Sequence, residues 1–172
     1  MKIMTERWKY DVIKKFDNCE LRKFHASVFA DVTVQSPYSA AGSIGFRPLV
    51  TYISQNQIEM TAPVLQERID EESWIISFVM PEGKSISSLP LAKNSTVILR
   101  EEPEHFAAVI SFKGFSSWNT VKEKEDELRE FLAQEKIKSI GPSRIARFDP
   151  PWMPGFLRHN EVVIPIENMG GD

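Results

Sequence analysis

The alternation of apolar and polar residues predicts short β-strands that recur in the two halves of the chain. Residues 21–22 (LR) and 29–32 (FADV) in the first half are echoed by residues 99–100 (LR) and 106–109 (FAAV) in the second. The echoes are offset by 78 residues at the first strand and by 77 at the second. In each half a polar or proline-containing connection joins the two strands. This weak duplication predicts a β-hairpin in each half.

A helical pattern follows the first predicted hairpin. Four apolar residues share the spacing i, i+3, i+4 and i+7 of an amphipathic helix: Phe46, Leu49, Val50 and Ile53. Pro48 interrupts this pattern, and a proline ring is tolerated only in the first helical turn. We therefore expect regular helix to begin near Gly45, or to bend there, after an irregular entry over residues 42–48.

A second helix is predicted at the corresponding place in the second half. Thr120 and Glu123 have the spacing of a capping box, and the helix is expected to run to about Gln134. Five apolar residues mark its buried face: Trp118, Val121, Leu128, Phe131 and Leu132.

Each predicted helix leads into another pair of strands. These cover residues 58–66 and 74–79 in the first half, and residues 143–148 and 161–166 in the second. The repeating unit is therefore strand, strand, helix, strand, strand, with residues 81–94 as a surface loop between the halves. Because sheets twist and curl, the predicted fold is α+β, a distorted antiparallel β-barrel with two flanking helices.

Length and composition indicate one globular domain over residues 1–172, with a core at about 17–167 and flexible ends at 1–10 and 168–172. A chain of this length can bury roughly 70% of its extended surface, so its core needs no disulfide. The formal net charge of −3 argues against nucleic acid and anionic membranes as partners. Cys19 is the single cysteine and is expected in a strand. Because residues 1–10 lack an apolar segment, we expect a soluble, cytoplasmic protein.

Few residues carry recognisable catalytic or metal-binding patterns. The three histidines are His25, His105 and His159, and none lies three or four residues from another histidine or from the cysteine, so the spacing does not indicate a closed zinc site. His25 shares strand parity with Lys23 and lies near Arg22, where an anion could be held. A strand histidine with one ordinary hydrogen bond is the simpler interpretation.

The most unusual segment is residues 149–156 (DPPWMPGF). Three prolines hold its backbone extended and present Trp152, Met153 and Phe156 on a loop. These side chains could line an apolar pocket, or they could cap one end of the barrel.

Several motifs together resemble the SOUL heme-binding protein family. They are GFR at 45–47, MTAPV at 60–64, ISFVMP at 76–81, and the string from DPPW at 149–152 to NEV at 160–162. The motifs occur in the family's order and the resemblance runs from about Asp17 to Glu167. It implies a distorted, gyrase-inhibitor-like β-barrel with two helices. It also implies non-covalent binding of heme or another tetrapyrrole for buffering, transport or sensing.

The resemblance also suggests which residues would contact the ligand. It places the tetrapyrrole against the first helix, at Phe46 and Val50 with Leu49 and Ile53 beside them. A tetrapyrrole is a large apolar plate, and its propionates favour basic partners at the rim. The basic candidates are Arg47, Arg22 and Lys23, and the apolar loop residues Trp152, Met153 and Phe156 complete the set.

The iron ligand departs from one family pattern. Some members resemble a Glu-hydrophobe-Arg-His string in the first strand, with that histidine as the axial ligand. Residues 20–23 of this chain read ELRK instead. His25 is therefore the candidate axial ligand if its strand presents it to the same face.

Two other classes of function stay open at this stage. One is an enzyme that acts on tetrapyrroles or small ester-like substrates through Glu59, Tyr52 or His25. The other is an interaction module that senses a small molecule. The sequence supports simple binding better, because no spacing pairs these residues for catalysis.

Overall fold

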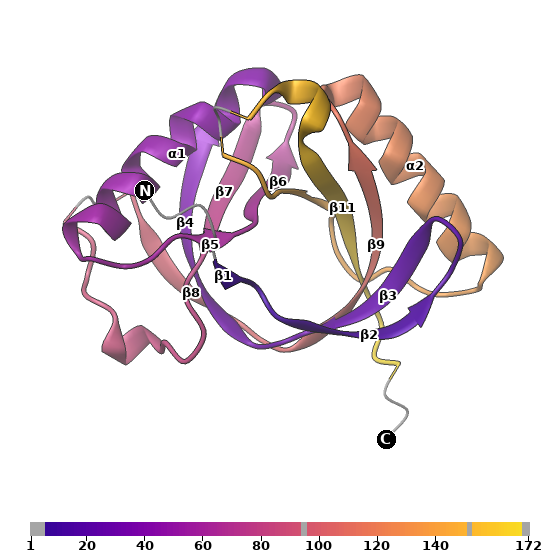
Figure 1. Cartoon of the computed structure of the whole chain (residues 1–172), viewed down its shortest axis with the longest axis horizontal. Helices are drawn as coiled ribbons and strands as arrows, with labels where there is room; N and C mark the ends of the chain where they lie inside the picture. The colour runs from indigo at the N-terminus through magenta and orange to yellow at the C-terminus, as the bar shows by residue number, and fades with distance from the viewer. Residues whose placement is uncertain (1–5, 94–95, 151–152, 170–172) are drawn as a thin grey trace. The chain divides into compact units, whose positions relative to one another are not determined.

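The computed structural model describes residues 6–93, 96–150 and 153–169. The chain forms two compact units, and each is built from two stretches of sequence. The first unit contains residues 1–8 and 26–103, and the second contains residues 9–25 and 104–172. Figure 1 shows the elements of both.

The first unit is an antiparallel sheet with one long helix. Its strands pair in the order β6-β7-β4-β8: β6 (Val64–Asp70), β7 (Ser73–Val79), β4 (Ser27–Gln35) and β8 (Ile98–Glu102). The helix α1 (Tyr38–Gln55) packs against β4 and β7 (Figure 1). Three short elements complete the unit: β1 (Glu6–Arg7), which pairs in parallel with β5 (Thr61–Ala62), and the 3-10 helix η1 (Ile86–Ser88).

The second unit has the same plan. Its antiparallel strands pair in the order β2-β3-β9-β11-β10: β2 (Tyr10–Lys15), β3 (Cys19–Phe24), β9 (His105–Lys113), β11 (His159–Ile166) and β10 (Arg144–Arg147). The helix α2 (Trp118–Gln134) packs against β9 and β11. A short 3-10 helix, η2 (Gly155–Leu157), precedes β11.

The α+β class, the antiparallel strands and the repeated order of two strands, a helix and two strands are confirmed. The predicted hairpins are wrong. β3 pairs with β2 and β9, and β4 pairs with β7 and β8, so the first strand of each half joins the unit built around the other half.

Turn chemistry explains why the hairpins do not form. Only residues 25–26 (HA) separate β3 from β4, and only residues 103–104 (PE) separate β8 from β9. A two-residue hairpin needs left-handed backbone, which glycine and asparagine adopt readily and His-Ala or Pro-Glu do not. In the described chain, positive φ occurs at other positions. The chain therefore continues from β3 into β4, and from β8 into β9, without forming a hairpin.

The prediction for the start of the first helix is also wrong. α1 begins at Tyr38, and Pro48 lies inside it rather than in its first turn. Buried residues occur on both sides of the proline: Ala41, Gly45, Leu49, Tyr52 and Ile53. Packing of this continuous face on the sheet outweighs the cost of one missing helical hydrogen bond.

For α2, the predicted end at Gln134 is confirmed, but its cap lies earlier than predicted. The Ser117 side chain, rather than that of Thr120, caps the helix and accepts a hydrogen bond from the Thr120 amide at 3.4 Å.

Gly45 marks the closest approach of α1 to the sheet. A Cβ built on Gly45 would lie 2.5 Å from Cγ1 of Ile76 on β7, far inside ordinary contact distance. The missing side chain therefore sets the depth at which the helix lies on the strand.

We expect Gly45→Ala to lower the free energy of unfolding by about 1–3 kcal/mol, because the core is overpacked. In an exposed helix the same change would raise stability by up to about 1 kcal/mol. Chemical denaturation measures the difference, with Ser43→Ala on the exposed side of α1 as the control. A Gly45→Ala variant as stable as wild type would contradict this packing.

Candidate functional site

The predicted ligand-binding residues of α1 divide into two groups. Leu49 and Ile53 are buried, and they belong to the face that packs against the sheet. Phe46 and Val50 are half-buried and Arg47 is exposed. The Phe46 ring meets Phe78 of β7 edge to face, with centroids 5.3 Å apart. Phe46 and Val50 are therefore partly accessible to solvent, whereas Leu49 and Ile53 are buried in the core.

One exposed apolar residue of α1 was missed by the sequence analysis. Ile44 is 48% exposed and lies two residues before Phe46. We call Ile44, Phe46, Arg47 and Val50 together the α1 surface. It combines apolar side chains with one exposed guanidinium, which fits an apolar ligand with an anionic edge.

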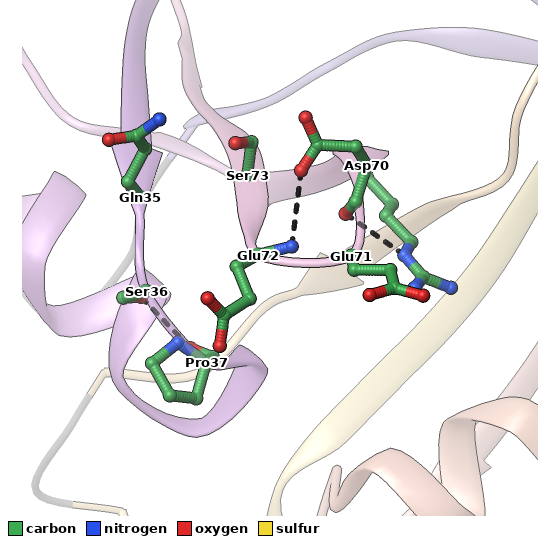
Figure 2. A pocket seen from close by; sticks show the side chains of 8 residues that line it. Gln35, Ser36, Pro37, Asp70, Glu71, Glu72 and Ser73 are labelled. Carbon is green, nitrogen blue, oxygen red and sulfur yellow. Dashed lines mark hydrogen bonds between the residues drawn. The ribbon is translucent and has the colours of Figure 1, made fainter.

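An open pocket in the first unit lies at the β6–β7 turn, and it contains none of the predicted residues. Its volume is about 1010 Å³ and its lining is polar: Gln35, Ser36, Pro37, Arg68, Asp70, Glu71, Glu72 and Ser73. Figure 2 shows the carboxylates of Asp70, Glu71 and Glu72 pointing away from one another. One Asp70 oxygen accepts a hydrogen bond from the Glu72 amide at 3.1 Å. Three carboxylates against one arginine make this pocket unsuitable for propionates.

His25 and Lys23 belong to the second unit, and each has an acidic neighbour. Nε2 of His25 lies 3.3 Å from Oδ2 of Asp11, and 40% of the His25 side chain is exposed. Nζ of Lys23 lies 3.3 Å from Oε1 of Glu104. Both side chains are partly exposed to solvent, so both stay candidate ligand contacts.

Arg22 is buried and fully engaged inside the second unit. Its Nη1 and Nη2 donate to the two oxygens of Glu161 at 2.7 and 2.8 Å, and Nη2 also donates to Glu20 at 2.7 Å. The Tyr10 ring lies 3.9 Å from the guanidinium carbon. Since only 2% of Arg22 is exposed, we leave it out of the proposed ligand contacts.

The pair of Arg22 and Glu161 stays charged. Burial alone would raise the pKa of Glu161, but contacts with His159, Arg22 and Ser111 outweigh it and lower the pKa to about 2. Burial would also lower the pKa of Arg22, yet the hydrogen bonds and charge of Glu161 and the hydrogen bond to Glu20 raise it. Oγ of Ser111 donates to Glu161 at 3.0 Å. A bidentate arginine and a hydroxyl thus satisfy the buried carboxylate.

The first unit contains a corresponding network around Arg100. Its Nε donates to Asp31 at 2.7 Å and its Nη1 donates to Glu102 at 2.6 Å. Oγ of Ser77 donates to Asp31 at 2.6 Å, and the Phe29 ring lies 5.0 Å from the guanidinium carbon. Each unit therefore surrounds one arginine with two carboxylates and an aromatic ring.

The sequence contained a signal for these networks that we did not use. Arg22 and Arg100 are the arginines of the duplicated Leu-Arg pair. Each has a glutamate two residues away, Glu20 before Arg22 and Glu102 after Arg100, on the same face of its strand. That combination indicates a paired arginine rather than one available to a ligand.

The proline-rich loop is only partly described. Trp152 lies outside the described residues. Met153 is half-buried, and its carbonyl accepts a hydrogen bond from Nε of Arg158 at 2.9 Å. Phe156 is 67% exposed, as is Phe115, whose ring packs directly against Gly155. Exposed aromatic rings thus occur beside η2, as the sequence suggested for Phe156.

Two groups that could act as nucleophiles, the Tyr52 hydroxyl and the Cys19 thiol, are buried. The Tyr52 hydroxyl is buried and donates to the Pro90 carbonyl at 2.7 Å, and burial raises its pKa. Cys19 is buried in β3, as predicted, and burial together with the charges of Glu127 and Glu135 raises the pKa of its thiol to about 11. Neither group is an activated nucleophile.

The low pKa of Glu161 predicts how stability depends on pH. The folded-state pKa, about 2, lies below the ordinary value of 4.5, so the ionised carboxylate stabilises the fold. This contribution, about 3 kcal/mol, is complete above about pH 5 and is lost as the pH falls toward 2.

We expect the difference in the free energy of unfolding between wild type and Glu161→Gln to shrink between pH 5 and pH 2, as measured by denaturation curves. Glu130→Gln, an exposed change on α2, should show no such trend. A pH-independent difference for Glu161→Gln would contradict the charged pair.

Comparison with solved structures shows the fold. A hydrolase from Listeria innocua matches with a TM-score of 0.62 and 13% identity, over 87% of this chain and 91% of that one. The C-terminal domain of EcmrR matches with a TM-score of 0.61 and 14% identity, over 92% of this chain and 98% of that one. SAV2435 bound to tetraphenylphosphonium matches with a TM-score of 0.54 and 11% identity, over 88% of this chain and 95% of that one. At these identities the likeness extends to the fold alone.

Comparison with sequences identifies the family. No curated protein matches the chain. The family model described as SOUL heme-binding protein matches residues 5–165, nearly the whole length. The chain therefore belongs to the SOUL heme-binding protein family.

Proposed function

We propose that the protein binds heme or a related tetrapyrrole non-covalently on the α1 surface, for buffering, transport or sensing in the cytoplasm. Membership of the SOUL heme-binding family supports the ligand class. The observation that supports the place is the partial exposure of Phe46 and Val50 beside Ile44 and Arg47. Among the described helices, none is long and apolar enough to cross a membrane.

The binding energy would come mainly from burial of the macrocycle against apolar side chains. Burial contributes roughly 25 cal/mol for each Å² of apolar surface, before the costs of association are subtracted. Arg47 would hold a propionate by a charge-assisted hydrogen bond. Heme, when bound, supplies an iron that accepts an imidazole or thioether and an intense Soret absorbance.

The second unit carries candidate ligand contacts of its own, proposed from the sequence. Phe156 and Met153 offer an aromatic ring and a thioether, and Lys23 offers a charge for a propionate. His25, with its half-exposed imidazole beside Asp11, is the proposed axial ligand. Its acidic neighbour would orient the ring.

An anionic ligand suits the α1 surface better than a cationic one. One fold neighbour was solved with tetraphenylphosphonium, a lipophilic cation. In this chain Arg22 pairs with the buried Glu161, and Arg100 pairs with Asp31 and Glu102. Glu161, Asp31 and Glu102 are thus held by arginines of the chain, whereas the exposed Arg47 of the α1 surface can pair with a propionate.

We expect hemin to shift and sharpen its Soret band when mixed with wild type, and Val50→Asp or Phe46→Asp to reduce the affinity at least tenfold. A carboxylate at either position would be desolvated under the macrocycle and would repel its propionates. Ile98→Asp, on the exposed part of β8, is the matched apolar-to-acidic control and should bind like wild type. Circular dichroism confirms folding of each variant. Wild-type affinity in both helix variants would place the ligand elsewhere.

The axial-ligand proposal has its own test. We expect His25→Ala to bind hemin more weakly and to move the Soret maximum, because the iron loses its imidazole. Asp11→Asn keeps the imidazole and should retain the Soret position of wild type, with a smaller loss of affinity. An unchanged spectrum in His25→Ala would show that His25 is not the axial ligand. The α1 surface is tested separately by the Phe46 and Val50 variants.

A further inference from the structure

The open pocket at the β6–β7 turn has a size and a lining that tetrapyrrole binding does not use. Its volume is about 1010 Å³, which is large enough for a small molecule. Among the described residues that line it, three carry a carboxylate and one a guanidinium, and none is aromatic or a large aliphatic. This lining favours a polar cation over an anion or an apolar ligand. We call this pocket the turn pocket.

Three polar side chains form a row across the sheet on the wall of the turn pocket. In the strand register Ser73 of β7 lies directly opposite Gln35 of β4 on one side and Asp70 of β6 on the other. Residues paired in this way present their side chains on the same face of a sheet. Figure 2 accordingly shows the Ser73 hydroxyl between the Gln35 amide and the Asp70 carboxylate. The row therefore presents an amide, a hydroxyl and a carboxylate to the same ligand.

The Ser73 hydroxyl is the observation that points to a ligand. Ser73 is only 8% exposed, and its hydroxyl makes no hydrogen bond to any residue that the structure describes. Buried polar groups are normally hydrogen-bonded, because an unmade hydrogen bond in the interior is unfavourable. Since Ser73 lines the turn pocket, an N–H group of a ligand there would supply the missing partner.

The carboxylates of Asp70 and Glu71 are exposed, and neither forms an ion pair with a described residue. One Asp70 oxygen accepts the Glu72 amide, which leaves the other oxygen for a ligand. Nε of Arg68 donates to the backbone carbonyl of Asp70 at 3.1 Å. Glu72 points toward Pro37, where the N-terminus of α1 favours a negative charge (Figure 2). Asp70 and Glu71 are thus the carboxylates that a bound cation would neutralise.

A metal ion does not fit this arrangement. The carboxylates point away from one another (Figure 2), and the described residues include no group of three His, Cys, Asp or Glu side chains that could hold a metal. Ammonium groups joined by a flexible chain can reach carboxylates that lie apart. We propose that the turn pocket binds a linear aliphatic polyamine, with ammonium groups paired with Asp70 and Glu71 and one N–H donated to Ser73. This inference goes beyond tetrapyrrole binding and does not depend on it.

Spermidine is the probe, and isothermal titration calorimetry measures its affinity at low ionic strength, because salt screens exposed ion pairs. We expect Asp70→Asn/Glu71→Gln to weaken binding at least tenfold. Asparagine keeps a side-chain oxygen for the Glu72 amide, so the turn stays intact. Ser73→Ala should weaken binding roughly three- to tenfold, because it removes one hydrogen bond without a change in charge.

The matched control is Glu123→Gln/Glu130→Gln, which removes the same charge from exposed positions of α2 in the second unit. This variant should bind spermidine like wild type. In isotope-labelled wild type, spermidine should shift the amide resonances of residues 35–37 and 68–73. Tetraphenylphosphonium, a cation without N–H groups, should bind the turn pocket more weakly, because the described lining offers little apolar surface.

The proposal is overturned if spermidine does not bind, if the α2 control loses as much affinity as Asp70→Asn/Glu71→Gln, or if Ser73→Ala binds like wild type. Diffuse attraction to an acidic surface predicts the second result, and a hydroxyl satisfied by water predicts the third. Tighter binding of Mg²⁺ or tetraphenylphosphonium than of spermidine in the turn pocket would also overturn it. Hemin titration of the same variants should match wild type, which separates failure of this proposal from failure of the α1 surface.

Discussion

The buried pair of Arg22 and Glu161 is the constraint on which the second unit depends. Arg22 on β3 and Glu161 on β11 lie on strands separated by β9, so their bidentate contact fixes the register of three strands at once. Loss of either partner would leave an unpaired charge in a dry interior, which typically costs about 3–5 kcal/mol. The pair also explains why β3 must join β9 rather than fold back on β4. With β3 beside β9, Arg22 reaches its carboxylate on β11.

This constraint shapes what the protein can bind. Arg22 and Arg100 bind the carboxylates beside them, so these charged groups are engaged within each unit. The helix α1 instead offers apolar side chains and an exposed Arg47 at the surface. Gly45 lets that helix lie close on β7, which buries Leu49 and leaves Phe46 and Val50 at the edge of the core. The packing of α1 thus determines which of its side chains are exposed at the surface.

Local sequence patterns predicted the elements better than their partners. The spacing of Phe46, Leu49, Val50 and Ile53 located α1, and the Leu-Arg repeat located β3 and β8, because periodicity reflects burial of one face. Strand pairing was missed, since it depends on contacts far apart in sequence, such as Arg22 with Glu161. The start of α1 was missed because packing around Gly45 outweighs Pro48. For the same reason the sequence could not separate buried Leu49 from half-buried Val50. The position of Glu20 did indicate that Arg22 is paired, and that signal was not used.

The central claim is that a tetrapyrrole lies against α1, and chemical-shift mapping tests it most directly. Titration of isotope-labelled protein with metal-free protoporphyrin IX would shift the amide resonances that the ring current reaches, without any dependence on an iron ligand. The account expects the largest shifts at residues 44–50, with small ones at the β6–β7 turn. Shifts that spare α1, or that gather around the acidic pocket at Asp70–Glu72, would contradict it.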